Sequence, residues 1–193
     1  MKKRLVIALV LVSLSAAATY AGPISYSASL SGPAESPPNA SPGVGFANVI
    51  YDSTLHTLML HVTFSGLLGT TTASHIHCCT LPTAGVATTT PTFAGFPLGV
   101  TSGTYDNTLD LTMASSYNPA FVTASGSIAL AEAALAGGLA NGVAYLNIHT
   151  SVVPGGEIRG FLTADVPEPA SLGLVGIALV GVWLARRKRV HQR

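Results

Sequence analysis

Two histidines separated by one residue are the feature of this sequence that most directly suggests chemistry. On a β-strand, His75 and His77 would project from the same face with their Cα atoms about 6 to 7 Å apart, while Ile76 would point into the core. His149 falls on the polar face of a second alternating stretch. If the two strands lie close together, the three imidazoles could hold one zinc or copper ion and leave a coordination position open to water. The alternative is that these histidines hydrogen-bond to loop backbone and shape the rim of the fold.

Cys78 and Cys79 directly follow the histidine pair and are the only cysteines in the chain. An even number of cysteines favours a disulfide in an oxidising compartment, although adjacent cysteines can pair only through an eight-membered ring. Three interpretations stay open: a vicinal disulfide, thiols that are free or linked to a partner, and one thiol that joins His75 and His77 as a soft metal ligand. Nucleophilic catalysis is not expected, because no Lys or Arg lies near in the sequence to favour a thiolate.

Arg159 is the only Lys or Arg between residues 22 and 165. Because a guanidinium attracts a carboxylate and Glu157 lies two residues away on the same predicted strand face, we expect the two to form a structural ion pair. Anion or substrate binding is the alternative. The chain has no G-x-S-x-G elbow, no P-loop, no dinucleotide-binding fingerprint and no readable pair of carboxylates for glycoside hydrolysis. We therefore expect a protein that is not an enzyme and has no catalytic residues.

The elements that must position these residues are short β-strands. Residues 58–64 alternate, with one face formed by Leu58, Leu60, Val62 and Phe64 and the other by Met59, His61 and Thr63. In the same way, the stretch that contains His149 turns two residues inward and three outward: Leu146 and Ile148 against Tyr145, Asn147 and His149. Further strands are predicted at residues 24–30, 46–51, 73–77, 109–113, 143–149 and 157–162. Residues 128–139 are rich in Ala and Leu and predict one short helix. The expected fold is mainly β, an immunoglobulin-like β-sandwich or barrel of about seven or more strands with one short helix.

The two ends of the chain have the pattern of targeting segments. Residues 1–21 begin with three basic residues, continue with the apolar run 5–12 and finish with small residues, which is typical of a secretory signal peptide; a retained N-terminal anchor is the alternative. Residues 166–193 contain Pro167-Glu168-Pro169, then sixteen uncharged residues at 170–185, then a basic tail at 186–193. The uncharged run predicts a short transmembrane helix with its cations on the cytoplasmic side, and a permanent single-span anchor is one interpretation of it.

Between these ends, residues 22–165 form the single predicted domain and contain almost no charge. Arg159 is opposed by seven acidic residues, which gives a formal charge of −6 with histidine neutral. Binding to nucleic acid depends on clustered Lys and Arg that neutralise phosphates. The sequence therefore excludes nucleic acid as a partner.

Three stretches of this domain resemble the CHRD domain first named in chordin: residues 30–38, residues 74–77, and residues 144–150 with the following 154–160. Similarly, the motif, apolar run and basic tail at the C-terminus resemble the PEP-CTERM sorting signal of Gram-negative bacteria. The first resemblance implies an all-β fold on an exported protein but no settled biochemical activity, and the cysteine pair departs from a general CHRD sequence. The second implies recognition by an exosortase, anchoring in the inner membrane before processing, and placement at the cell surface or in an exopolysaccharide matrix.

The sequence thus predicts an exported, surface- or matrix-associated protein with a binding or structural role and no required cofactor. Its expected partners are an exosortase-type processing enzyme, exopolysaccharide or other surface proteins, and the membrane through the C-terminal helix. The alternative is a periplasmic or surface protein that binds zinc or copper through His75, His77 and His149. Redox activity of the bound metal is one form of this alternative.

Overall fold

The computed structural model describes residues 22–165. The predicted signal peptide at 1–21 and the predicted sorting segment at 166–193, with its transmembrane helix, lie outside the described residues. Eight strands and two α-helices make up the described part, and the bounds of the strands are β1 (Ile24–Ser31), β2 (Val44–Asp52), β3 (Thr57–Ser65), β4 (Thr71–His77), β5 (Gly103–Asp110), β6 (Tyr145–Thr150), β7 (Ile158–Phe161) and β8 (Thr163–Ala164).

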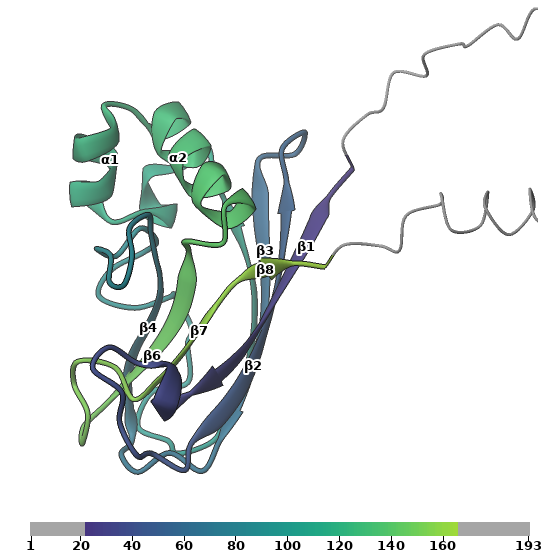
Figure 1. Ribbon diagram of the computed structural model, residues 1–193. Coiled ribbons are helices and arrows are strands. Elements are labelled where there is room, and N and C mark those ends of the chain that lie inside the picture. Colours follow the sequence, from purple (N-terminus) through teal and green to yellow (C-terminus); the bar gives the residue numbers. More distant parts are fainter. Residues whose placement is uncertain (1–21, 166–193) are drawn as a thin grey trace, which may run out of the picture.

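All eight strands belong to one antiparallel sheet with the order β4-β6-β7-β1-β2-β3-β5, and β8 pairs with β1 beside β7. The sheet curls into a half-barrel, so that β4, β6 and β7 form one wall and β2, β3 and β5 form the other (Figure 1). The prediction of a mainly β fold is confirmed. The fold differs from a sandwich because its two walls are connected through β1 and are not two separate sheets.

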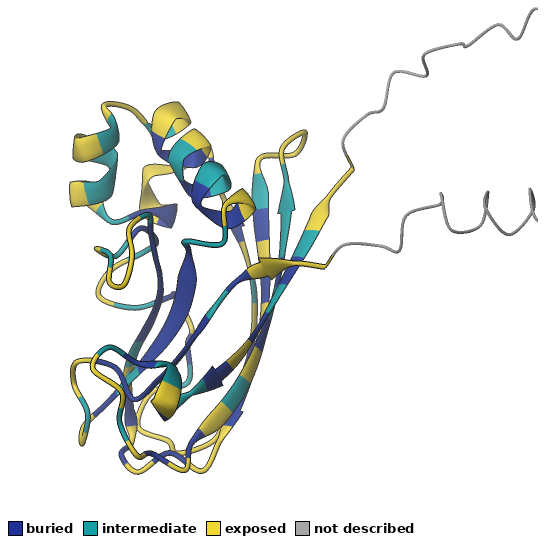
Figure 2. Cartoon of the chain, viewed as in Figure 1, coloured by how far each residue is buried: buried dark blue, intermediate teal, exposed yellow. Residues whose placement is uncertain are grey.

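The core lies between the two walls and follows the predicted alternation. In β3 the four inward residues are between 0 and 4% exposed, and the inward residues of β4 and β6 are fully buried: Leu58, Leu60, Val62 and Phe64, then Ile76, Leu146 and Ile148. The outward residues of β3 are partly or fully exposed, as expected for a sheet with one wet face. By contrast, β4 and β6 are buried on both faces over most of their length, because loops cover their outer side (Figure 2).

Two helices cover one end of the half-barrel: α1 (Pro119–Ser125) and α2 (Ile128–Ala140) (Figure 1). The predicted helix at 128–139 corresponds to α2, whose N-terminus is capped by the Ser127 hydroxyl accepting from the Leu130 N–H at 3.2 Å. Helix α1 was not predicted from the sequence, although Asn118 caps it and Pro119 begins it. With seven residues, α1 is too short to show a helical repeat of apolar positions.

No single helix within residues 22–165 is long and apolar enough to cross a membrane. Taken together, α1 and α2 have sufficient length and apolar composition, but they are bent by 94° relative to each other.

One strand is displaced from its predicted position. Residues 109–113 were expected to be extended, but β5 covers Gly103–Asp110 and the chain turns at Leu111. The reason is that β5 is the edge strand on its side of the sheet and buries only Tyr105 and Leu109 of its eight residues. Because β5 is mostly polar, it shows little alternation of apolar residues. The prediction was placed at residues 109–113 because apolar residues are more frequent there.

Candidate metal centre

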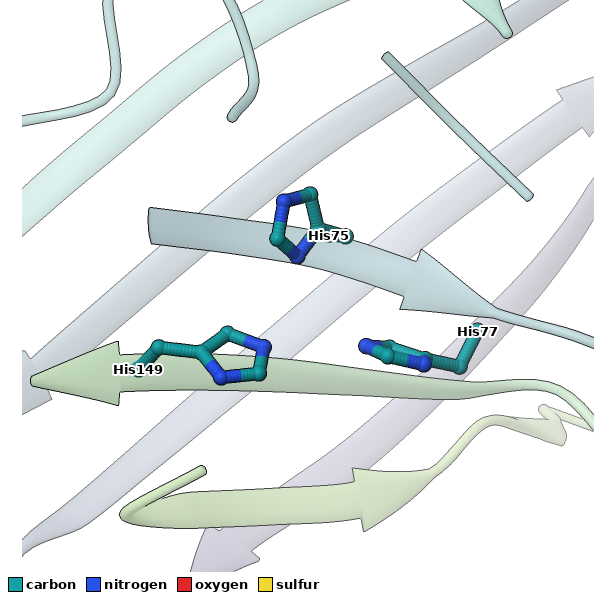
Figure 3. A group of neighbouring side chains, drawn as sticks. All are labelled: His75, His77 and His149. Atoms are coloured by element: carbon teal, nitrogen blue, oxygen red, sulfur yellow. The ribbon is translucent and has the colours of Figure 1, made fainter. Parts of the chain in front are cut away.

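The three candidate histidines lie together on the outer face of the β4–β6 pair. His75 and His77 come from β4 and His149 from β6, and antiparallel pairing sets His75 opposite Asn147 and His77 opposite Tyr145. One ligand atom of each histidine lies within 4.8 Å of those of the other two. Figure 3 shows the three rings gathered over the two neighbouring strands. The condition for a three-histidine site, that the two strands lie close together, is therefore met.

One nitrogen of each ring is bonded to a backbone carbonyl. The partners are the carbonyl oxygen of Pro91 for His75 Nε2 at 2.5 Å, of Ala84 for His77 Nδ1 at 2.9 Å, and of Pro154 for His149 Nδ1 at 2.9 Å. Because a carbonyl oxygen only accepts, each of these nitrogens must be the one that holds a proton. The second nitrogen then has a free lone pair.

These second nitrogens are buried and have no hydrogen-bond partner: His75 Nδ1, His77 Nε2 and His149 Nε2. Unpaired polar atoms are uncommon in protein interiors, and here three of them belong to one cluster. A metal-bound histidine usually donates its other N–H to a backbone carbonyl or a carboxylate, which orients the ring. The cluster has this arrangement at all three positions.

Burial keeps the three imidazoles neutral. Burial is the main cause that lowers the pKa of His75 to about 4, and the neighbouring His149 and His77 contribute in the same direction. Burial also lowers the pKa of His77 and that of His149, against an opposing effect of their carbonyl partners. Neutral imidazole is the form that binds zinc or copper.

The spacing of the clustered ring nitrogens is wider than in a metal-bound site but within reach of one. With metal–nitrogen bonds of about 2.0 to 2.1 Å, the nitrogens of a tetrahedral zinc site are roughly 3.3 Å apart. One ligand nitrogen of each histidine lies within 4.8 Å of those of the other two, so these nitrogens would have to approach one another by up to about 1.5 Å to bind one ion. His75 is 6% exposed and His77 is 9% exposed, so the protein shields the centre from solvent on most sides.

The ring of His77 packs against an aromatic side chain, which in turn packs against a cationic one. The ring stacks on Tyr145 with 4.9 Å between centroids and an angle of 7° between planes. The Arg159 guanidinium lies 4.8 Å from the centroid of the same tyrosine ring and donates to the carbonyl oxygens of Ala34 and Pro82 at 2.5 and 3.0 Å. Arg159 thus holds together two loops that cover this face of the sheet.

The predicted ion pair between Glu157 and Arg159 is wrong. The carboxylate nearest to Arg159 is Glu35, with 3.8 Å between Nε and Oε2. Glu157 accepts hydrogen bonds from the Ser41 and Thr150 hydroxyls at 2.6 and 2.5 Å and from two backbone N–H groups of the loop after β3. Burial raises the pKa of Glu157, but these hydrogen bonds outweigh it and leave that pKa below its ordinary value. Proximity in sequence suggested the wrong partner, because residues from distant loops contact Arg159 and Glu157 in place of each other.

Cys78 and Cys79 are joined by a disulfide bond in the structure. Their sulfur atoms pack against α2, at 3.9 and 3.4 Å from the carbonyl oxygen of Ala134. The interpretation of one cysteine as a ligand next to His75 and His77 is wrong, because the cysteine sulfurs contact the helix and are not part of the histidine cluster.

Two buried residues near the histidines were missed from the sequence. Glu35, in the loop after β1, is 7% exposed, and burial raises its pKa to about 7 although Arg159 pulls it down. Asn147, on β6, is 3% exposed. One oxygen of each has no partner. Glu35 lies in the stretch 30–38 that resembles the CHRD domain. This resemblance marked the stretch, but only the fold shows that Glu35 lies near the histidines.

Two other histidines pair with acids away from this cluster. His56 Nδ1 lies 2.9 Å from Glu132 Oε2, and His61 Nδ1 lies 2.6 Å from Asp106 Oδ1. Both histidine side chains are about half exposed, at 51% and 48%. His56 is in the turn before β3 and not on the strand itself.

Comparison with known families identifies two segments of the chain. Residues 26–162 match the CHRD domain, and residues 165–189 match the PEP-CTERM protein-sorting motif. The first match covers well over half of the chain, so the chain belongs to the CHRD domain family. The second identifies an exported protein that is anchored in the membrane before an exosortase-type system processes it. No curated protein and no solved structure matches the chain.

Proposed function

We propose that this protein is an exported metal-binding protein of the cell surface or extracellular matrix, whose CHRD domain holds one zinc or copper ion on His75, His77 and His149. The observation that carries the proposal is the pattern of hydrogen bonds at the three rings. Each histidine has one nitrogen fixed by a backbone carbonyl, and the three remaining nitrogens converge without partners.

A purely structural role explains only half of this pattern. If the histidines served to hold loops in place, the bonds to Pro91, Ala84 and Pro154 would be sufficient, and the second nitrogens would be expected to face solvent or a donor. Leaving a buried acceptor unpaired costs about 1 to 3 kcal/mol for each group. A bound metal ion would satisfy all three nitrogens at once.

The test is metal binding by the exported protein, purified without a histidine tag and titrated with Zn²⁺ and with Cu²⁺. We expect one ion per chain. His75→Ala and His149→Ala should each lower the affinity by more than the roughly 10- to 100-fold that follows the loss of an outer-shell partner. His61→Ala is the matched control, because His61 is half exposed and bonded to Asp106 outside the cluster. Substoichiometric zinc and copper, unchanged in His75→Ala, would contradict the proposal.

Binding to exopolysaccharide is a second candidate function, favoured by a different surface. A groove of about 570 Å³ runs over the outer ends of β2, β3 and β5, and its lining is uncharged: Val44, Gly45, Phe46, Thr63, Phe64, Ser65, Gly103 and Thr104. Phe46 is 45% exposed there and lies between Ser29 of β1 and Thr63 of β3 in the sheet. An exposed aromatic ring among hydroxyl groups suits a neutral sugar chain better than a charged polymer.

A pull-down with native matrix polysaccharide tests this second candidate. The exported protein should be retained, and Phe46→Ala should reduce its retention several-fold. Met59→Ala is the control, since Met59 is similarly exposed, at 51%, but lies outside the groove. Equal retention of both variants, or none for the unmodified protein, would count against a role of this groove.

A further inference from the structure

Five buried side-chain atoms within residues 22–165 have no hydrogen-bond partner, and all five belong to one region. Three are the free histidine nitrogens of the candidate metal centre, and the other two are oxygens, Glu35 Oε1 and Asn147 Oδ1. Both of these residues are more than nine-tenths buried. The metal ion of the proposed function accounts for the nitrogens but not for the oxygens.

The position of Asn147 connects the oxygens with the histidines. Asn147 lies directly opposite His75 in the β4–β6 ladder and two residues before His149 on the same face of β6. Directly opposed residues of an antiparallel pair have Cβ atoms about 4.5 to 5.5 Å apart. The Asn147 side chain therefore starts from the base of the histidine cluster.

Glu35 reaches the same place from the loop after β1. A Cβ atom added to Gly156 would lie 2.5 Å from Asn147 Nδ2, 2.7 Å from Asn147 Oδ1 and 2.9 Å from Glu35 Oε1. The Asn147 side chain also hydrogen-bonds to the Glu35 carboxylate, which lowers the pKa of Glu35. The oxygens Glu35 Oε1 and Asn147 Oδ1 are therefore at most about 5.6 Å apart, a separation that one water molecule can bridge. Gly156 has a φ of 129°, a conformation that favours glycine, and glycine places no side chain in this space. A pocket of about 270 Å³ lined by Glu35, Val153 and Gly156, among others, adjoins this point.

We propose that the fourth ligand of the metal ion is a water molecule whose two O–H groups donate to Glu35 Oε1 and Asn147 Oδ1. The inference rests on the proposed metal site. A metal-bound water has two hydrogens to donate, and the site offers two unpaired acceptors beside three unpaired ligands. One hydrated ion therefore satisfies all five atoms, and the adjoining pocket gives small molecules or anions a route to exchange with the water. Arg159, at 3.8 Å, holds the Glu35 carboxylate in place.

The test uses the exported protein loaded with Cu²⁺ in water enriched in oxygen-17, and reads exchangeable oxygen on the copper by electron–nuclear double resonance. We expect a coordinated, exchangeable water in the unmodified protein. In Asn147→Leu, which keeps the size of the side chain but removes the acceptor, the water signal should be lost or displaced, and the Cu²⁺ affinity should fall about 10-fold or more. The nitrogen couplings of the three histidines should remain.

Asn107→Leu is the matched control, because Asn107 lies on β5, on the opposite wall, and bonds to Ala94 and Tyr105. It should leave the oxygen signal and the affinity unchanged. Copper bound by three histidines without an exchangeable water, or a water that is unaffected by Asn147→Leu, would overturn this inference and leave the metal site itself standing. Absence of bound Cu²⁺ in the unmodified protein would overturn both.

Discussion

At each of the three clustered histidines, the backbone decides which ring nitrogen carries the proton. The carbonyls of Pro91 and Ala84 belong to the loop after β4, and that of Pro154 belongs to the loop between β6 and β7. Loops that cover the outer face of the sheet thus determine the tautomers, while the strands determine where the rings lie. Both are needed before the free nitrogens can meet.

The lowered histidine pKa values predict that the metal-free protein is destabilised by mild acid. His75 has a pKa of about 4 in the folded protein and 6.5 as its ordinary value, so the folded state binds its proton less readily than the unfolded state. The stability from this group is present above pH 6.5 and is lost as the pH falls toward 4; for His75 it amounts to roughly 3 kcal/mol. Urea denaturation of metal-free protein at pH 7.5 and pH 4.5 measures the loss. His75→Gln should lose less stability between these two pH values, and an unchanged loss would disprove the assignment.

The raised pKa of Glu35 predicts that its contribution to stability depends on pH in the opposite direction. Burial raises its pKa from 4.5 to about 7, so the folded state binds this proton more tightly than the unfolded state does. The stability from this group is complete below pH 4.5 and is lost as the pH rises through 7, by roughly 3 kcal/mol at most. Glu35→Gln should therefore gain stability relative to the unmodified protein as the pH increases from 4.5 to 8. The difference between their free energies of unfolding at several pH values tests this, and a difference that is independent of pH would refute it.

At the scale of elements, α2 and the end of β4 are joined by an unusually close contact. A Cβ atom on Gly138 would overlap the Cys78 sulfur and would lie 2.9 Å from that of Cys79, so the helix can approach the disulfide only because this position has no side chain. The neighbouring Gly137 has open space around its Cα. The two adjacent glycines of α2 therefore have different roles.

This difference gives a matched pair of substitutions. Gly138→Ala should destabilise the protein by about 1 to 3 kcal/mol, because a methyl group is forced into a packed contact with sulfur. Gly137→Ala should stabilise it by up to about 1 kcal/mol, since alanine is the better helix former and meets nothing. Thermal and urea denaturation of both variants will show opposite signs. Similar effects at the two positions would mean that the helix does not pack on the disulfide as described.

The parts of the fold that could be predicted from sequence are those with a strong local pattern. Alternation identified β3, β4 and β6 and placed the histidines on one face, and the Ala- and Leu-rich run identified α2. Strand β5 was misplaced because most of its residues are polar. The partner of Arg159 could not be predicted, since Glu35 reaches it from the other end of the chain through the folding of a loop. The same holds for the role of Asn147, which only the pairing of β4 with β6 and the approach of Gly156 make visible.

At the scale of the whole molecule, the first and the last strand of the domain pair with each other. Strand β8 pairs with β1, where Tyr26 is opposite Ala164, and the Asp165 carboxylate accepts hydrogen bonds from the hydroxyls of Ser25 and Ser27, both at 2.6 Å. The points at which the chain enters and leaves the domain are therefore neighbours (Figure 1). Asp165, which makes this closure, is also the first residue of the segment that matches the sorting motif.

The sorting motif gives a prediction in cells that contain an exosortase-type system. Replacing Glu168 and Pro169 by alanine should leave the full-length protein in the membrane fraction, because the processing enzyme no longer recognises the segment. Blots of membrane and released fractions measure this, and the ratio should shift several-fold toward the membrane. Met113→Ala, at an exposed position of the domain, is the control and should be released normally. Normal release of the double variant would show that sorting does not depend on this motif.

The pairing of β1 with β8 also affects how the domain meets its surroundings. Since both ends of the domain leave at one corner, anything attached to either end is attached next to the β1–β8 pair. The histidines lie on β4 and β6, and β7 separates these two strands from β1 in the sheet. A connection at either end of the domain therefore leaves the two strands that carry the histidines free of the attachment point.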